Sequence, residues 1–183
     1  IVYPLYSRDA WDALSKMFAS VKSGNADLAM QFADGYYGRN NDGTYRDNSS
    51  EAFIAITCLD YPVNADVATM TAQRAELEAA APTIGTYFAY GDLQCAEWPG
   101  ANPPARAPAT STTTAPIVVI GTTNDPATPY QWAVNLASEL PTAVLVTYNG
   151  EGHTAYNKSN ACVSTAVDDF FVEGIVPQAG LTC

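Results

Sequence analysis

Residues 116–126 read PIVVIGTTNDP, and they carry the clearest fold signal in the sequence. The β-branched run after the first proline is typical of a strand covered on both faces in a parallel sheet. Beyond it we predict a helix over residues 128–140 with Thr128 as its N-cap, a strand over 143–148, and a helix from Asn160. Strand, helix, strand and helix joined by short connections predict an α/β fold.

The first hundred residues have a different pattern and are predicted to be mostly helical. Helices are expected over residues 7–22, 28–36 and 64–81, with a capped apolar segment over 52–59. Proline and threonine dominate residues 99–115, a composition that resists packing and favours extended backbone. We therefore expect a helical region (1–98), a linker (99–115) and an α/β region (116–183).

The composition indicates a globular protein with an acidic surface. The chain has 183 residues, a hydrophobic content of 48% and a formal net charge of −11. This charge argues against nucleic acid and anionic membranes as partners, because both attract basic surfaces. No apolar run reaches the roughly 20 residues that a membrane-spanning helix requires. The chain begins at Ile1 without a methionine, so we expect an earlier segment to have been removed.

The four cysteines favour two disulfides, as in an exported protein that is secreted or held at the cell surface. They lack C-x-x-C spacing and the chain has one histidine, so we expect no metal site and no cofactor. Of the three possible connectivities, we favour Cys58–Cys95 with Cys162–Cys183, because each pair falls within one predicted region. Buried free thiols are the alternative.

Asp125 and His153 are the candidate chemical groups. Asp125 follows the first predicted strand, and His153, the chain's one histidine, follows the second. If these strands are parallel neighbours, both side chains lie at one edge of the sheet, where reactive groups gather in α/β proteins. A carboxylate there can orient an imidazole that acts as a general base. The alternatives are an ordinary Asp-Pro turn and a surface histidine.

Two segments carry a resemblance to a known family. Residues 116–129 and the stretch GEGHTAY at 150–156, followed by Cys162 and Cys183, closely resemble the C-terminal region of secreted actinobacterial tripeptidyl aminopeptidases. These enzymes belong to the α/β-hydrolase peptidases that include proline iminopeptidase. The resemblance is looser over residues 1–110.

The resemblance implies a partial α/β-hydrolase fold, with a helical cap followed by the last two parallel strands and helices of the core. It makes Asp125 the acid and His153 the base of a Ser/His/Asp triad, and it supports the Cys162–Cys183 pairing. The segments at 58–60 and 95–99 look like parts of the family's cap.

The nucleophile does not appear in the sequence. In α/β-hydrolases the serine precedes the acid and the histidine and lies in a G-x-S-x-G turn, which this chain lacks. Neither Ser23 nor Ser138 has the flanking glycines, so we assign neither. We expect the serine and the oxyanion hole to come from a missing N-terminal half of the core, and the chain alone to be inactive.

Three acids of the cap region are candidates for substrate binding. By resemblance, Asp60, Glu51 and Glu97 could hold the free α-amino group of a peptide substrate, with Asp60 as the first choice. The alternative is a solvated acidic surface, where most carboxylates lie.

Three functions follow from these observations. The leading one is an exported serine exopeptidase that releases short peptides from N-termini. An esterase or other acyl hydrolase would use the same fold and triad, because neither sets specificity. The third is a secreted binding module without catalytic activity.

Overall fold

A computed structural model describes residues 1–100, 103–105 and 107–183. Contacts divide the chain into two compact units, one of residues 1–41 with 108–183 and one of residues 42–107. The helices and strands of the first unit are α1 (Val2–Leu5), η1 (Arg8–Ala10), α2 (Trp11–Lys22), α3 (Asp27–Tyr37), β1 (Ile117–Asn124), α6 (Tyr130–Glu139), β2 (Ala143–Glu151) and α7 (Ala161–Glu173). Those of the second are α4 (Ser49–Asp60), α5 (Val67–Ala80), η2 (Gly85–Phe88) and η3 (Gly91–Cys95).

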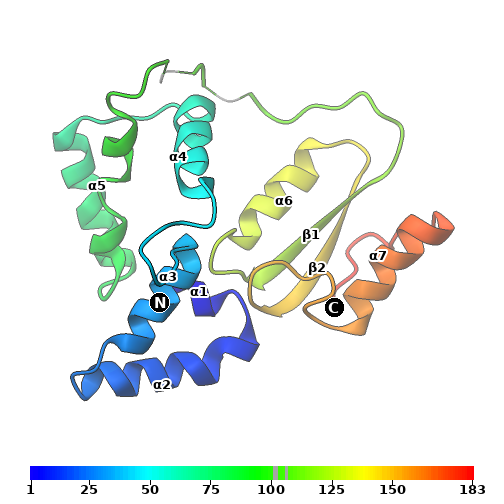
Figure 1. The fold of residues 1–183 in the computed structure, drawn as a ribbon. Coiled ribbons are helices and arrows are strands. Elements are labelled where there is room, and N and C mark those ends of the chain that lie inside the picture. The colour runs from blue at the N-terminus through cyan, green and yellow to red at the C-terminus, as the bar shows by residue number, and fades with distance from the viewer. Residues whose placement is uncertain (101–102, 106) are drawn as a thin grey trace. The chain divides into compact units, whose positions relative to one another are not determined.

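The two strands form a parallel sheet, which confirms the predicted partial α/β fold. Ile117 pairs with Ala143, and the register continues to Thr122 before an irregularity that ends at Asn124. At this irregularity the Thr123 hydroxyl accepts the main-chain N–H of Gly150 at 3.1 Å. Helices α6 and α7 flank the sheet (Figure 1). Parallel pairing with helical coverage is the arrangement that a continuous β-branched run favours.

Helix α6 lies unusually close to β1. A Cβ atom added at Gly121 would lie 2.8 Å from the Cβ of Ala133 and 2.8 Å from the ring of Tyr130, so any larger residue would force α6 away. The Tyr130 hydroxyl also shares a 2.7 Å hydrogen bond with the hydroxyl of Thr147 in β2. Gly121 and Tyr130 together fix the helix on the sheet.

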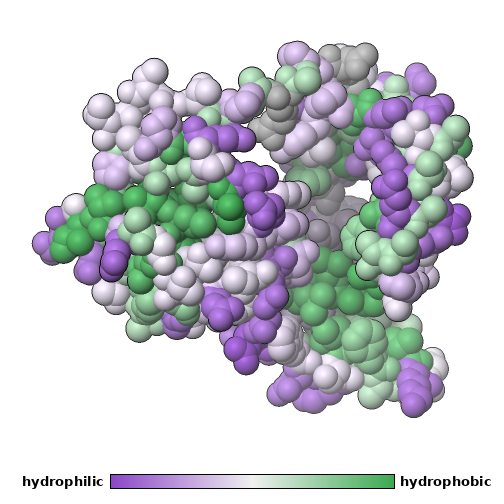
Figure 2. Space-filling view, turned by 180° about the vertical axis from the view of Figure 1, so that it is seen from behind, coloured by the Kyte–Doolittle hydropathy of each residue, from purple (hydrophilic) through white to green (hydrophobic). Residues whose placement is uncertain are grey.

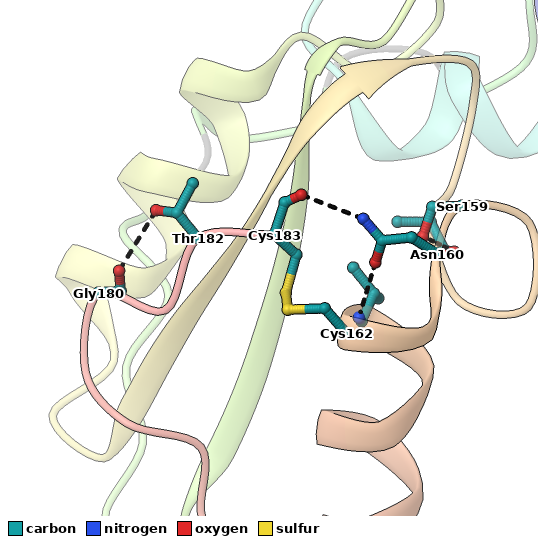
Figure 3. The surroundings of a disulfide bond; sticks show 8 residues. Ser159, Asn160, Cys162, Gly180, Thr182 and Cys183 are labelled. Atoms are coloured by element: carbon teal, nitrogen blue, oxygen red, sulfur yellow. Dashed lines mark hydrogen bonds between the residues drawn. A yellow bond between two sulfur atoms is a disulfide. The ribbon is translucent and has the colours of Figure 1, made fainter.

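The C-terminal residues cover the outer edge of β2. The Thr147 N–H donates to the Leu181 carbonyl at 2.9 Å, and the Cys183 N–H donates to the Thr147 carbonyl at 2.8 Å. Asn160 caps α7 by accepting the Val163 N–H, and its amide donates to the Cys183 carbonyl (Figure 3). Within the described ranges, no strand pairs with the opposite edge of β1.

Each unit contains one disulfide, and the pairs are those favoured from the sequence. Cys58 in α4 is bonded to Cys95 in η3, with both residues buried. Cys162 in α7 is bonded to Cys183, which ties the C-terminal residues to the helix (Figure 3).

The unit of residues 42–107 has a small core around its disulfide. Met70 of α5 is buried with the two cysteines. Asp66 caps α5, where its carboxylate accepts the Thr69 N–H at 2.7 Å. None of the helices in the described part of the chain is long and apolar enough to span a membrane.

Several element boundaries differ from the prediction. Thr128 does not cap α6, because its hydroxyl donates to Asp125 and the helix begins at Tyr130. Strand β2 continues to Glu151, three residues beyond the predicted strand end. The predicted division into residues 1–98, 99–115 and 116–183 stays a prediction, and its linker includes residues 101, 102 and 106, which lie outside the described residues.

Candidate active site

Asp125 stands directly after β1 with its carboxylate held by nearby donors. One oxygen accepts the main-chain N–H groups of Ala127 at 2.8 Å and Thr128 at 2.9 Å. The other accepts the Thr128 hydroxyl at 2.9 Å. The Asp125 side chain is 4% exposed. Because a buried carboxylate needs donors, this loop is built to keep Asp125 charged in a fixed position.

His153 lies beyond the end of the neighbouring strand β2. Its Nδ1 atom is 3.0 Å from both carboxylate oxygens of Asp125, and its side chain is 27% exposed. The predicted pair is therefore in contact at the carboxyl end of the two parallel strands. Thr128 also approaches Nδ1, with its hydroxyl at 3.3 Å.

The protonation state of Asp125 sets the tautomer of His153. Burial raises the pKa of Asp125, but the hydrogen bonds from Thr128, Ala127 and His153 together outweigh burial and lower this pKa. The carboxylate is then ionised at neutral pH and can only accept hydrogen bonds. In a neutral imidazole bonded to this carboxylate, Nδ1 carries the proton, and this tautomer leaves the Nε2 lone pair available for general-base chemistry.

The backbone between β2 and the site makes a sharp turn. Gly152 has φ +106° and Thr154 has φ 65°, both in the left-handed region. For a β-branched residue such as Thr154 this conformation is strained, and such strain concentrates at functional sites. The Thr154 N–H lies 3.4 Å from the second Asp125 oxygen, so the strained turn also faces the carboxylate.

Tyr6 was not predicted as part of this site. Its carbonyl accepts the His153 main-chain N–H at 2.9 Å, and the two side-chain rings are 5.0 Å apart between centroids. Tyr6 is far from His153 in the sequence and lies in no motif, so nothing in the sequence alone indicates this contact.

An apolar hollow lies beside Asp125. It has a volume of about 390 Å³ and lies between β1, α6 and residues 154–156. Trp132 of α6 lines it and is 60% exposed. The hollow therefore exposes apolar surface on one face of β1.

The three predicted substrate-binding acids all lie in the unit of residues 42–107. Glu51 is in the first turn of α4, Asp60 is its last residue, and Glu97 follows η3. All three are exposed. Their role in substrate binding stays a prediction.

Two other sequence predictions concern nucleophiles and metals. The Ser23 hydroxyl donates to the Ser20 carbonyl, and the Ser138 hydroxyl donates to the Asn135 carbonyl, both at 2.7 Å. Neither serine has a histidine as its hydrogen-bond acceptor in these contacts. Across the residues that the structure describes, no group of three or more His, Cys, Asp or Glu side chains could hold a metal ion.

Comparison with known proteins finds one matching family model and several related proteins. The family model described as TAP-like protein matches residues 81–183. The chain is 38% identical to Carboxylesterase B of Mycobacterium tuberculosis over 98% of its length and 35% of that protein. It is 31% identical to the Serine protease Hip1 of the same species, over 100% of this chain and 35% of that protein. It is 23% identical to the Tripeptidyl aminopeptidase of Streptomyces lividans, over 97% of this chain and 33% of that protein.

The chain thus spans about a third of the length of the curated relatives that it matches. The parallel sheet, the acid and histidine at its carboxyl edge, and the family match over more than half of the chain agree with one another. The resemblance to the tripeptidyl aminopeptidase group is confirmed, and this chain belongs to the TAP-like family of α/β-hydrolases.

Proposed function

We propose that this chain supplies the acid and the base of a serine hydrolase that releases short peptides from the N-termini of its substrates. The observation that carries the proposal is the contact of His153 Nδ1 with both oxygens of Asp125 at 3.0 Å. Its support is the geometry of an acid that fixes the tautomer of a general base. The two disulfides further support an exported protein.

The proposed chemistry is an acyl transfer in two steps. His153 Nε2 takes the proton of a serine hydroxyl as the serine oxygen bonds to the substrate carbonyl carbon. The imidazolium then gives this proton to the leaving amine, and the C–N bond breaks to leave an acyl-enzyme. In the second step His153 activates a water molecule that hydrolyses the ester. Throughout, Asp125 stays ionised and stabilises the imidazolium.

We propose that the serine belongs to polypeptide outside this chain, in an N-terminal half of the hydrolase core. Two observations support this partner. The relatives are about three times as long as the matched region. The edge of β1 with which no described strand pairs is flanked by exposed apolar residues, with Trp132 on α6 60% exposed and Phe171 on α7 79% exposed. Unpaired strand edges with apolar flanks are normally covered by further strands and helices.

Figure 2 shows this apolar surface over α7. Phe171 and the neighbouring Val172 are both exposed there. A second hollow of about 290 Å³ lies between β1 and α7 and is lined by Val118, Val167 and Phe170. We expect the next strand and helices of the complete core to fill both hollows.

The partner proposal is tested by turnover. The purified 183-residue chain should not hydrolyse a tripeptidyl p-nitroanilide or a p-nitrophenyl ester. Co-expression with the upstream polypeptide of the same gene should restore hydrolysis, and a fluorophosphonate should abolish it. Fluorophosphonate-sensitive turnover by the purified chain alone would contradict the proposal.

An esterase is the second candidate, because one relative at 38% identity is named a carboxylesterase. The two candidates differ in the ratio of kcat/KM for a tripeptidyl anilide to kcat/KM for an acyl ester. For a peptidase we expect the Asp60→Asn substitution in the full-length protein to raise KM for free-amine peptides more than for N-blocked peptides. An equal effect on both substrates would remove Asp60 from amine recognition. A full-length protein that hydrolyses neither substrate would favour the binding module.

A further inference from the structure

The segment after α1 packs behind the histidine. The His153 main-chain N–H donates to the Tyr6 carbonyl at 2.9 Å. The Tyr6 ring lies 5.0 Å from the imidazole between centroids, with the two planes tilted by 49°. His153 is therefore contacted by Asp125 at Nδ1 and by Tyr6 across its ring.

The turn into His153 is shaped to admit this contact. Gly152 is buried and has φ +106°. A Cβ atom added there would lie 3.1 Å from the Tyr6 carbonyl oxygen. Because the left-handed region and the close approach both favour glycine, the same residue allows the chain to turn and Tyr6 to approach.

Tyr6 is itself held by α3. Its ring makes an edge contact with the ring of Tyr36, at 6.4 Å between centroids. The pKa of Tyr6 is raised, first by its hydrogen bond with Tyr36, then by burial, and further by the charge of Asp125. Tyr6 therefore stays neutral at neutral pH and does not compete with Asp125 as a negative partner of the imidazole.

We propose that Tyr6 is a positioning residue for His153. Hydrogen bonding at Nδ1 alone leaves the imidazole able to rotate over a limited range, because the terminal torsion of histidine is broad. The Tyr6 ring narrows this rotation to the orientation in which Nδ1 meets Asp125 and Nε2 stays free. The contribution to catalysis rests on the proposed function, but the position of the ring is testable without turnover.

The experiment uses the fact that the chain has one histidine. With ¹⁵N- and ¹³C-labelled histidine, NMR of the 183-residue chain gives a single imidazole. The measured quantities are the exchange rate of its Nδ1–H with water, the shifts of its carbon-bound protons, and their NOEs to the Tyr6 ring. The variants are Tyr6→Leu, Tyr6→Phe and, as a matched control, Tyr87→Leu, which changes a tyrosine that is 82% exposed in η2.

We expect Tyr6→Leu to speed the Nδ1–H exchange about two- to tenfold, the range that an aromatic contact implies. It should also remove the ring-current shift of the imidazole protons. Tyr6→Phe loses the hydrogen bond with Tyr36 but keeps the ring, so its exchange rate and ring-current shift should stay close to those of the unchanged protein, as should those of Tyr87→Leu.

Three results would overturn the role of Tyr6. These are the absence of an NOE between Tyr6 and His153 in the unchanged chain, unchanged exchange in a folded Tyr6→Leu, or a Tyr6→Phe that behaves like Tyr6→Leu. If Tyr6→Leu does not fold, the NOE and the Tyr6→Phe variant still decide whether Tyr6 positions His153. Failure of the proposed function has a separate signature, because it would appear as absent hydrolysis by the full-length protein and would leave the NOE and the exchange rates of His153 unchanged.

Discussion

The candidate acids of the two units are held in opposite ways. In the unit of residues 1–41 and 108–183, the Asp125 side chain is 4% exposed and accepts hydrogen bonds from Ala127, Thr128 and His153. In the unit of residues 42–107, Glu51, Asp60 and Glu97 are all exposed. A buried carboxylate with its donors in place has a position and a charge that the fold specifies. An exposed carboxylate has a charge but needs a bound partner to define its position.

The largest expected effect separates these two kinds of acid. If the proposed function holds, Asp125→Asn in the full-length protein should lower kcat by about 10⁴, the loss typical of a triad carboxylate replaced by an amide that favours the wrong tautomer. Asp60→Asn should act mainly on KM for free-amine peptides. Steady-state kinetics of both variants measure the contrast. A loss of kcat below about tenfold for Asp125→Asn would remove the residue from the triad.

The two disulfides allow the units to be compared in stability. Cys58–Cys95 closes a separation of 37 residues, and Cys162–Cys183 closes one of 21. In the chain-entropy model each contributes about 3 to 4 kcal/mol. Replacing either pair by alanines should lower the free energy of unfolding by about this amount.

Urea unfolding followed by hydrogen exchange would assign each loss to a unit. Removing Cys162–Cys183 should reduce the protection of main-chain amides from exchange in α7 and β2. Removing Cys58–Cys95 should reduce this protection in α4. Equal loss of protection in both units from either variant would show that the units do not unfold separately.

Glycine substitution tests the close packing of α6 on β1. Gly121→Ala should destabilise the chain by about 1 to 3 kcal/mol, because the new Cβ would overlap Ala133 and Tyr130. Gly91→Ala is the matched control, since nothing lies within 4 Å of a Cβ at that position. Denaturation midpoints of the two variants give the comparison, and similar midpoints would contradict the described packing.

The smallest effect is a pH dependence of stability. The pKa of Asp125 is lowered in the folded chain, so its contribution to stability is present above the unfolded pKa of about 4. It is lost as pH falls through the folded pKa. The difference in unfolding free energy between the unchanged chain and Asp125→Asn should therefore shrink below about pH 4. If this free-energy difference instead grows as the pH falls, the shift in the Asp125 pKa has the opposite sign, which would contradict the assigned hydrogen bonds.

Much of the α/β part could be predicted because its signals are local. The β-branched run at 117–120 and the helical spacing after Pro129 predict the strand and helix by their periods. Asp125 and His153 could be paired because parallel strands bring their carboxyl ends to one edge.

Other features could not be predicted, because competing local signals or distant contacts decide them. Thr128 has the sequence position of a helix cap, but the buried Asp125 carboxylate takes its hydroxyl. Asn149 and Gly150 favour a turn by composition, yet β2 runs through them because Gly150 bonds to Thr123 across the sheet. The contact of Tyr6 with His153 depends on tertiary packing and has no local signature.

We propose that His153 is a catalytic base whose serine lies outside these 183 residues. The most direct measurement is mass-spectrometric mapping of a fluorophosphonate adduct on the full-length protein, with His153→Ala as the control. If His153 has this role, we expect one modified serine upstream of Ile1, modified far more slowly in the control. An adduct on a serine within residues 1–183, or equal labelling of the control, would contradict it.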